Sequence, residues 1–401
     1  MTSSPDSREK IPAVVVGGEL GGLGLVRSLS RQGFPVFVVD TKLARPALWS
    51  RHARRRIIRS FTGREFVEDM IALGQRLRNR PVLFLTDEDV VHSVSENREE
   101  LAHWFRFRLP DERGVRLLSS KSDFHRFAGE HAFPVPRTVI LNDQFDIHLL
   151  AGLRFPCVIK PDDKRMALSG SKERAVRVET LAEGKKHARE MLRTPGGIVA
   201  QEWIEGAESN IHFTLFYRGR DGTIPAVFTG RKLSCWPPDV GSTAVCIAAP
   251  EAREELERIT LAFADRAGFD GLGSMEYKWD DNHHRFVMIE PTVGRIDYQE
   301  EIATLCGVNI PLAAYHHELG LPAPPMATAP PPRAWRSTFI RRAPPGLMPA
   351  GTRIADGFFR WDDPLPAIQH YCVNQPLERL MHQWAGWFPS TRREQVQQEQ
   401  P

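Results

Sequence analysis

The order of apolar and polar positions predicts alternating strands and helices in the first part of the chain. Apolar runs at residues 13–18 and 35–40 predict buried strands, and helical spacing of apolar residues at 23–32 separates them. A third strand pattern at 81–90 ends in acidic residues, and a helical pattern at 92–105 follows it. This alternation predicts a doubly wound parallel sheet with helices on both faces, an α/β arrangement.

The pattern changes near Ser119, where antiparallel pairs replace the alternation. A serine N-cap signal opens a predicted helix at 119–133. Predicted short strands follow at 155–161 and 197–206, and predicted hairpins pair 210–218 with 224–232 and 273–280 with 285–291, with a helical pattern at 251–267 between them. This second part of the chain therefore reads as α+β.

A proline-rich stretch at 321–333 is the clearest boundary in the sequence. The residues after it carry four tryptophans, and they could cap an active site or mediate a homodimer. The expected organisation is an α/β domain at 11–118, an α+β domain at 119–320 with lobes at about 119–195 and 196–320, a linker at 321–333 and an extension at 334–401.

The composition argues against nucleic-acid-binding, secreted and membrane proteins. The 401 residues carry a net charge of +3, which is too small to argue for a nucleic-acid partner. The basic run at 51–59 is interpreted as a solvated face, with phosphate or nucleic-acid binding as the alternative. The five cysteines are scattered, and no apolar stretch reads as a signal peptide or a membrane span. We therefore expect a cytoplasmic protein without a membrane partner.

The glycine-rich turn near the N-terminus resembles a dinucleotide site only in outline. That signature needs glycines at i, i+2 and i+5. Only Gly22 and Gly24 are two apart, and the third position then falls on Arg27. Asp40 stands where a ribose-binding acid would be, but an acid after the second strand is common in doubly wound sheets. The sequence therefore argues against NAD.

Two acids on the second hairpin are candidates for metal ligands. If the turn centres near Asn282, Glu276 lies opposite Met288, and Glu276 and Glu290 are diagonal neighbours on one face. Carboxylates so placed suit Mg²⁺. The alternative is a pair of solvated strand acids, and a register slip of one residue would separate the two.

Several other residues fit the binding of a nucleotide. Lys160 ends an apolar strand, and the small residues 169–171 form a loop whose backbone could hold phosphates. The apolar Trp203 and Ile204 lie between acids. Arg231, Lys232 and Arg295 supply positive charge of the kind that phosphoryl transfer needs. The polar residues 86–88 at a strand end could face an amine substrate, or they are ordinary loop residues.

This ordered set resembles the ATP-grasp superfamily, and most closely its bacterial carboxylate–amine ligases. The resemblance covers roughly residues 11–321. It implies a Rossmann-like domain that holds no dinucleotide, followed by a two-lobed ATP-grasp domain. It also implies nucleotide-binding roles for Lys121, Lys160, Ser169, Gly170, Ser171, Glu202, Trp203, Ile204 and Glu208, metal ligation by Glu276, Glu290 and Thr292, and catalytic roles for Lys232, Arg231 and Arg295. Within the nucleotide site, Glu202 to Ile204 would hold adenine through their backbone, and Glu208 would hold the ribose.

One position departs from the family pattern. The family usually has asparagine two residues after the second acid, and this chain has Thr292 there. A threonine hydroxyl is a weaker Mg²⁺ ligand, so the second metal position and the catalytic power depend on it.

The resemblance implies an ATP-dependent ligase. Mg-ATP would phosphorylate a small carboxylate, an amine would attack the acyl phosphate, and an amide, ADP and phosphate would result. The cofactors would be ATP and one or two Mg²⁺ ions, with Mn²⁺ as an alternative ion. A non-catalytic ATP-binding sensor or scaffold is the second hypothesis, and a dinucleotide-dependent oxidoreductase is the third.

Overall fold

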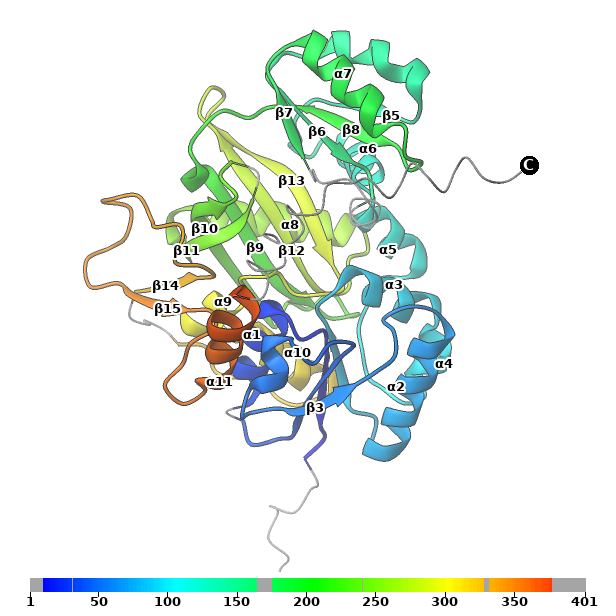
Figure 1. The fold of residues 1–401 in the computed structure, drawn as a ribbon, viewed down its shortest axis with the longest axis vertical. Coiled ribbons are helices and arrows are strands. Elements are labelled where there is room, and N and C mark those ends of the chain that lie inside the picture. The colour runs from blue at the N-terminus through cyan, green and yellow to red at the C-terminus, as the bar shows by residue number, and fades with distance from the viewer. Residues whose placement is uncertain (1–9, 31, 164–174, 240, 328–331, 377–401) are drawn as a thin grey trace, which may run out of the picture.

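The computed structural model describes residues 10–30, 32–163, 175–239, 241–327 and 332–376, and in this part of the chain the strands form three sheets. Figure 1 shows the N-terminal sheet at one end of the molecule, the largest sheet in the middle and a small sheet at the other end. None of the helices in these ranges has the length and apolar character needed to cross a bilayer.

The N-terminal sheet is parallel and has the strand order β3-β2-β1-β4, as the alternating pattern predicts. Its strands are β1 (Ala13–Val16), β2 (Val36–Asp40), β3 (Arg54–Ile57) and β4 (Val82–Leu85). Its helices are α1 (Leu20–Ser30), α2 (Gly63–Leu77), α3 (Glu88–Glu96) and α4 (Arg98–Ala102). The basic run falls on the exposed edge strand β3, where Arg54 and Arg56 lie over the ring of Phe37.

The glycine turn between β1 and α1 is closed by the protein itself. Gly17 has a φ of 103°, and a Cβ there would lie 2.0 Å from Thr86 Oγ1. The Gly18 N–H donates to the Asp40 carboxylate at 2.7 Å. Burial raises the pKa of Asp40. Asp40, which stands where a dinucleotide site would have its ribose-binding acid, therefore stabilises the glycine turn instead.

The small sheet has the order β5-β8-β6-β7 and is antiparallel. Its strands are β5 (Thr138–Leu141), β6 (Cys157–Pro161), β7 (Val176–Val178) and β8 (Ile198–Glu202). It is accompanied by α5 (Glu112–Ser119), α6 (Lys121–Glu130), the 3-10 segment η2 (Gln144–Gly152) and α7 (Leu181–Met191). The Ser120 hydroxyl accepts from the Asp123 N–H and caps α6, as the N-cap signal predicts. Strand β8, which lies beyond the expected lobe boundary at about 196, pairs within this sheet.

The largest sheet has the order β13-β12-β9-β10-β11-β14-β15. Its strands are β9 (Ile211–Arg218), β10 (Ala226–Trp236), β11 (Ser242–Ala248), β12 (Gly271–Asp280), β13 (Arg285–Val293), β14 (Arg333–Arg336) and β15 (Arg353–Asp356). Helix α8 (Arg253–Arg266) packs on one face, and α9 (Glu301–Leu305) and α10 (Ile310–Glu318) pack with α1 on the other. Both predicted hairpins are present, and β14 and β15 show that the C-terminal extension completes the sheet.

The extension is held to the N-terminal domain by a buried arginine. Arg27 on α1 donates to the carbonyls of Gly357 and Phe358, each at 2.7 Å, and pairs with Asp363 at 3.3 Å. The charge of Glu301 lies beside the same guanidinium. The last described elements, α11 (Leu365–Ala367) and the π-helix η6 (Ile368–Asn374), follow these contacts.

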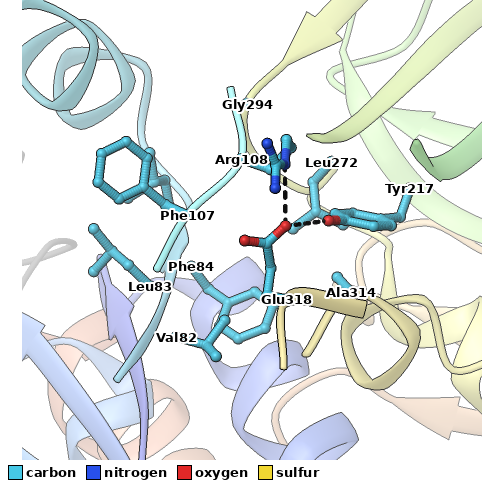
Figure 2. Close-up of a pocket in the computed structure, with 11 residues that line it drawn as sticks. Val82, Leu83, Phe84, Phe107, Arg108, Tyr217, Leu272, Gly294, Ala314 and Glu318 are labelled. Carbon is cyan, nitrogen blue, oxygen red and sulfur yellow. Dashed lines mark hydrogen bonds and ion pairs between the residues drawn. The ribbon is translucent and has the colours of Figure 1, made fainter. Parts of the chain in front are cut away.

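A small cavity lies where the N-terminal sheet meets the largest sheet (Figure 2). Arg108 and Tyr217 both donate to the Glu318 carboxylate there, at 3.1 and 2.6 Å. The cavity holds about 20 Å³, which is enough for a single water molecule and far too little for a nucleotide. This region is therefore an interface between the N-terminal sheet and the largest sheet.

A buried acid in the same core gives a test of the packing. Glu300 is 2% exposed, and burial together with the charge of Glu301 raises its pKa to about 8. Because the folded pKa is above the unfolded value, the native state binds the extra proton. The wild type should therefore lose stability relative to Glu300→Gln as the pH rises from about 4.5 to 8, by about 1.4 kcal/mol per pH unit at most. Urea unfolding at pH 6 and pH 8.5 measures this, and equal pH dependence of the two proteins would contradict it.

Candidate nucleotide and metal site

Glu276 and Glu290 lie directly opposite each other on neighbouring strands. The ladder pairs Glu276 with Glu290 and Tyr277 with Met288, because a bulge shifts the register after Glu276. The expected pairing of Glu276 with Met288 was therefore wrong, and the two acids are closer than diagonal neighbours. Directly opposed strand residues have Cβ atoms about 4.5–5.5 Å apart, a spacing at which two carboxylates can share a cation.

Lys232 on β10 reaches across β9 to the first of these acids. Its ammonium group forms an ion pair with the Glu276 carboxylate, and its side chain is 7% exposed. Burial alone would lower the pKa of Lys232, but the negative charge of Glu276 outweighs it, and the pKa is raised. Lys232 is thus a fixed positive charge beside the acid pair.

The donor atoms at this place suit a hard divalent cation. Thr292 is paired with Ser274 and lies two residues beyond Glu290, so its side chain is on the same face of β13. Two carboxylates and a hydroxyl are the oxygen donors that Mg²⁺ prefers. Within the described ranges no three His, Cys, Asp or Glu side chains converge as a preformed metal centre. The acid pair fits Mg²⁺ as a partial ligand set that other oxygens, such as those of a phosphate, would complete.

The two lysines of the first lobe lie on α6 and β6. Lys121 at the start of α6 donates to the Asp162 carbonyl at 3.2 Å, and Lys160 lies at the end of β6. Burial lowers the pKa of His125 to about 3, and the charges of Lys160, Glu290 and Lys121 also act on that ring. His125 on α6 is therefore neutral, and it lies within electrostatic range of charged groups from both lobes.

The segment after β8 runs beside a polar cavity. Glu202 and Ile204 line a space of about 310 Å³, in the size range of small-molecule sites. Arg154 donates to the Glu202 carboxylate at 2.9 and 3.1 Å, which lowers the pKa of Glu202 despite its burial. The Trp203 N–H donates to the Pro156 carbonyl at 3.0 Å. The predicted adenine-binding residues are therefore fixed in place, with that one N–H already used.

Trp203 contacts a lysine that the sequence interpretation did not select. The ammonium group of Lys278 lies 4.8 Å from the centre of the indole, and the Arg177 guanidinium lies 4.7 Å from it. Burial lowers the pKa of Lys278. Glu276 lies two residues before Lys278 on β12, so strand alternation places both on one face of the sheet. That spacing is the sequence signal from which Lys278 could have been selected.

Glu208 is the acid expected to bind ribose, and it is held by three donors. The backbone N–H groups of Cys235 and Asp239 donate to it at 3.1 and 2.9 Å. Arg341 of the C-terminal extension donates at 2.8 Å. Burial opposes ionisation of Glu208, but these hydrogen bonds outweigh it and lower its pKa.

Several known proteins are similar to this chain in sequence or in fold. No protein-family model matches the chain. D-aspartate ligase of Enterococcus faecium is 22% identical over 328 residues, 77% of each chain. The ADP complex of N5-carboxyaminoimidazole synthetase from Staphylococcus aureus superposes with a TM-score of 0.62 at 14% identity, over 78% of each chain. Biotin carboxylase from Campylobacter jejuni superposes with a TM-score of 0.60 at 15% identity, over 79% of this chain and 73% of that one.

The chain has the ATP-grasp fold. The expected combination of a Rossmann-like domain and a two-lobed ATP-grasp domain is confirmed, and the relatives named above are enzymes. Both of the solved structures named above are nucleotide complexes, the synthetase with ADP and the carboxylase with β,γ-ATP.

Some predicted residues do not join the ATP-grasp site. Arg231 lies on the face of β10 opposite to Lys232, where it pairs with Glu251 at 3.6 Å. Arg295 pairs with Glu88 at 3.7 Å and links the large sheet to the N-terminal domain. Within the described part of the chain, the ion pairs of both arginines are with acids other than Glu276 and Glu290. The predicted phosphate loop, Ser169, Gly170 and Ser171, lies outside the described residues.

The polar strand end at 86–88 is already engaged. The Thr86 hydroxyl donates to the Val16 carbonyl at 3.0 Å, and Asp87 caps α3 by accepting from the Asp89 N–H. Glu88 is the acid that pairs with Arg295. All three residues therefore have partners within the protein, and the expectation that this strand end faces an amine substrate stays a prediction.

The ion pair between Lys232 and Glu276 gives a prediction about stability. Glu276→Ala leaves a buried ammonium without its partner, so the free energy of unfolding should fall by about 3–5 kcal/mol without any ligand. The double variant Lys232→Met with Glu276→Leu should recover most of that loss, because no buried charge remains. Urea unfolding measures both. A loss below about 1 kcal/mol in the single variant would show that the pair is solvated.

Proposed function

We propose that the protein is an ATP-dependent carboxylate–amine ligase that releases ADP and phosphate and forms an amide through an acyl phosphate. One observation carries the proposal. A single sheet face holds Lys232, Glu276 and Glu290 together, and the charges of Lys121 and Lys160 in the other lobe act on the same buried histidine as the charge of Glu290. Fixed charges of both signs between two lobes suit phosphoryl transfer, which needs positioning and charge neutralisation.

Each residue has a task in this proposal. Lys121 and Lys160 bind phosphate oxygens, and the strand segment at Glu202 to Ile204 holds the adenine. Lys232 is a permanent cation that neutralises charge on the transferred phosphoryl group. Mg²⁺, when bound by Glu276, Glu290 and Thr292, would supply further charge neutralisation at the phosphates.

The substrates are small molecules, a carboxylate and an amine. The relative named D-aspartate ligase supports ligation as the class of reaction and makes amino acids the first candidates for a substrate panel. The fold neighbours support ATP as the nucleotide, because two of them are nucleotide complexes.

Thr292 favours a second candidate, an ATP-binding sensor or scaffold without ligase activity. A hydroxyl is a weaker cation ligand than the side-chain amide oxygen that the family pattern implies at this position. Such a protein would bind ATP and turn over no acid–amine pair.

The assay that tests the proposal mixes the full chain with Mg-ATP, amino acids and other small carboxylic acids, and measures ADP, AMP and phosphate. ADP and phosphate should appear only with an acid and an amine together. Glu290→Gln should lower this rate by at least about a hundredfold, because it removes one of the two charged oxygen ligands. Glu254→Gln, an exposed change on α8, is the matched control and should leave the rate unchanged.

Other outcomes separate the alternatives. AMP and pyrophosphate would overturn the acyl-phosphate route. ATP binding with no turnover across the panel would favour the sensor. Equal rates in the wild type and Glu290→Gln would show that the acid pair takes no part in the reaction.

A further inference from the structure

A loop of the C-terminal extension, residues 337–347, contacts Glu208, the acid proposed to bind ribose. Both ends of the loop are fixed to the large sheet. The Ser337 hydroxyl donates to the Thr243 carbonyl at 2.8 Å, and the Leu347 carbonyl accepts from Arg231 at 3.4 Å. The loop is therefore anchored on both sides, and the residues between its anchors are held near one place.

Arg341 lies between these anchors and contacts Glu208. The guanidinium is 2.8 Å from Glu208 Oε2, across 133 residues of sequence. A carboxylate has about four acceptor positions. Two on Oε2 are used by Arg341 and the Cys235 N–H, and one on Oε1 is used by the Asp239 N–H. Among the residues that the structure describes, no donor takes the second position on Oε1, which leaves it for a ligand hydroxyl.

We propose that Arg341 is a positioning residue for the nucleotide, which orients the Glu208 carboxylate so that it accepts a hydrogen bond from a ribose hydroxyl. The inference rests on the proposed function, because it assigns the ribose to Glu208. The extension thereby completes the nucleotide site, in addition to completing the sheet.

The contact has the properties that this role needs. A charge-assisted hydrogen bond is stronger than a neutral one, and the planar guanidinium fixes the direction of its acceptor. Glu208 is 15% exposed and Arg341 is 35% exposed, so the pair is screened less than a surface ion pair.

The test compares the affinity for Mg-ATP with that for 2′,3′-dideoxy-ATP, measured by calorimetry on the full chain. The wild type should prefer ATP about tenfold, the expected contribution of one hydrogen bond to a charged group. Arg341→Ala should bring this ratio close to one, and Arg341→Lys should keep part of it. Arg342→Ala removes an exposed arginine at the next position and should keep the wild-type ratio.

The ratio separates a role at the ribose from a general loss of stability. A merely structural role would weaken both nucleotides equally and leave the ratio at its wild-type value, and that result would overturn the inference. A wild type that binds both nucleotides equally would also overturn it, because Glu208 would then accept no hydrogen bond from a ribose hydroxyl. A wild type that binds neither nucleotide would instead contradict the proposed function, which requires ATP binding.

Discussion

The candidate site depends on one irregularity in the ladder between β12 and β13. The bulge after Glu276 places this acid directly opposite Glu290 instead of one pair away. Without it, the alternation of strand side chains would move one of the acids along the sheet or to its other face. With it, the carboxylates stand side by side, and Lys232 approaches from two strands away. The charge arrangement on which phosphoryl transfer would depend is therefore a consequence of strand register.

The second constraint is that the site lies between parts of the chain that must be held together. The lysines come from the small sheet and α6, whereas the acids come from the large sheet. The extension joins the large sheet through β14 and is fixed to the N-terminal domain by the buried Arg27. A buried charge is stable only when it is paired and hydrogen-bonded, so Arg27 fixes the position of the extension closely. That position in turn brings Arg341 to Glu208.

The sequence predicts most of the fold, because apolar periodicity is set locally. The parallel N-terminal sheet, the capped helix at Ser120 and both hairpins follow from patterns a few residues long. Within one strand, the residues that share a face were also predictable, because side chains alternate: Lys278 lies on the same face as Glu276. The register after Glu276 was not predictable, since a bulge has no clear local signal in this hairpin. The pairing of Arg341 with Glu208 is a contact across 133 residues, and nothing near either position indicates it. Arg231 and Lys232 lie on opposite faces of β10 because adjacent strand residues alternate, and Lys232 is the one that pairs with an acid of the site.

The central claim is that a substrate carboxylate attacks the γ-phosphate at the Lys232, Glu276 and Glu290 face. The most direct measurement uses an acid–amine pair from the substrate panel, with the carboxylate oxygens labelled with ¹⁸O, and follows the label by mass spectrometry. If an acyl phosphate forms, one ¹⁸O atom must pass from the acid to the released phosphate for each amide formed. Amide formation with unlabelled phosphate would contradict the account, because the carboxylate would not have been phosphorylated.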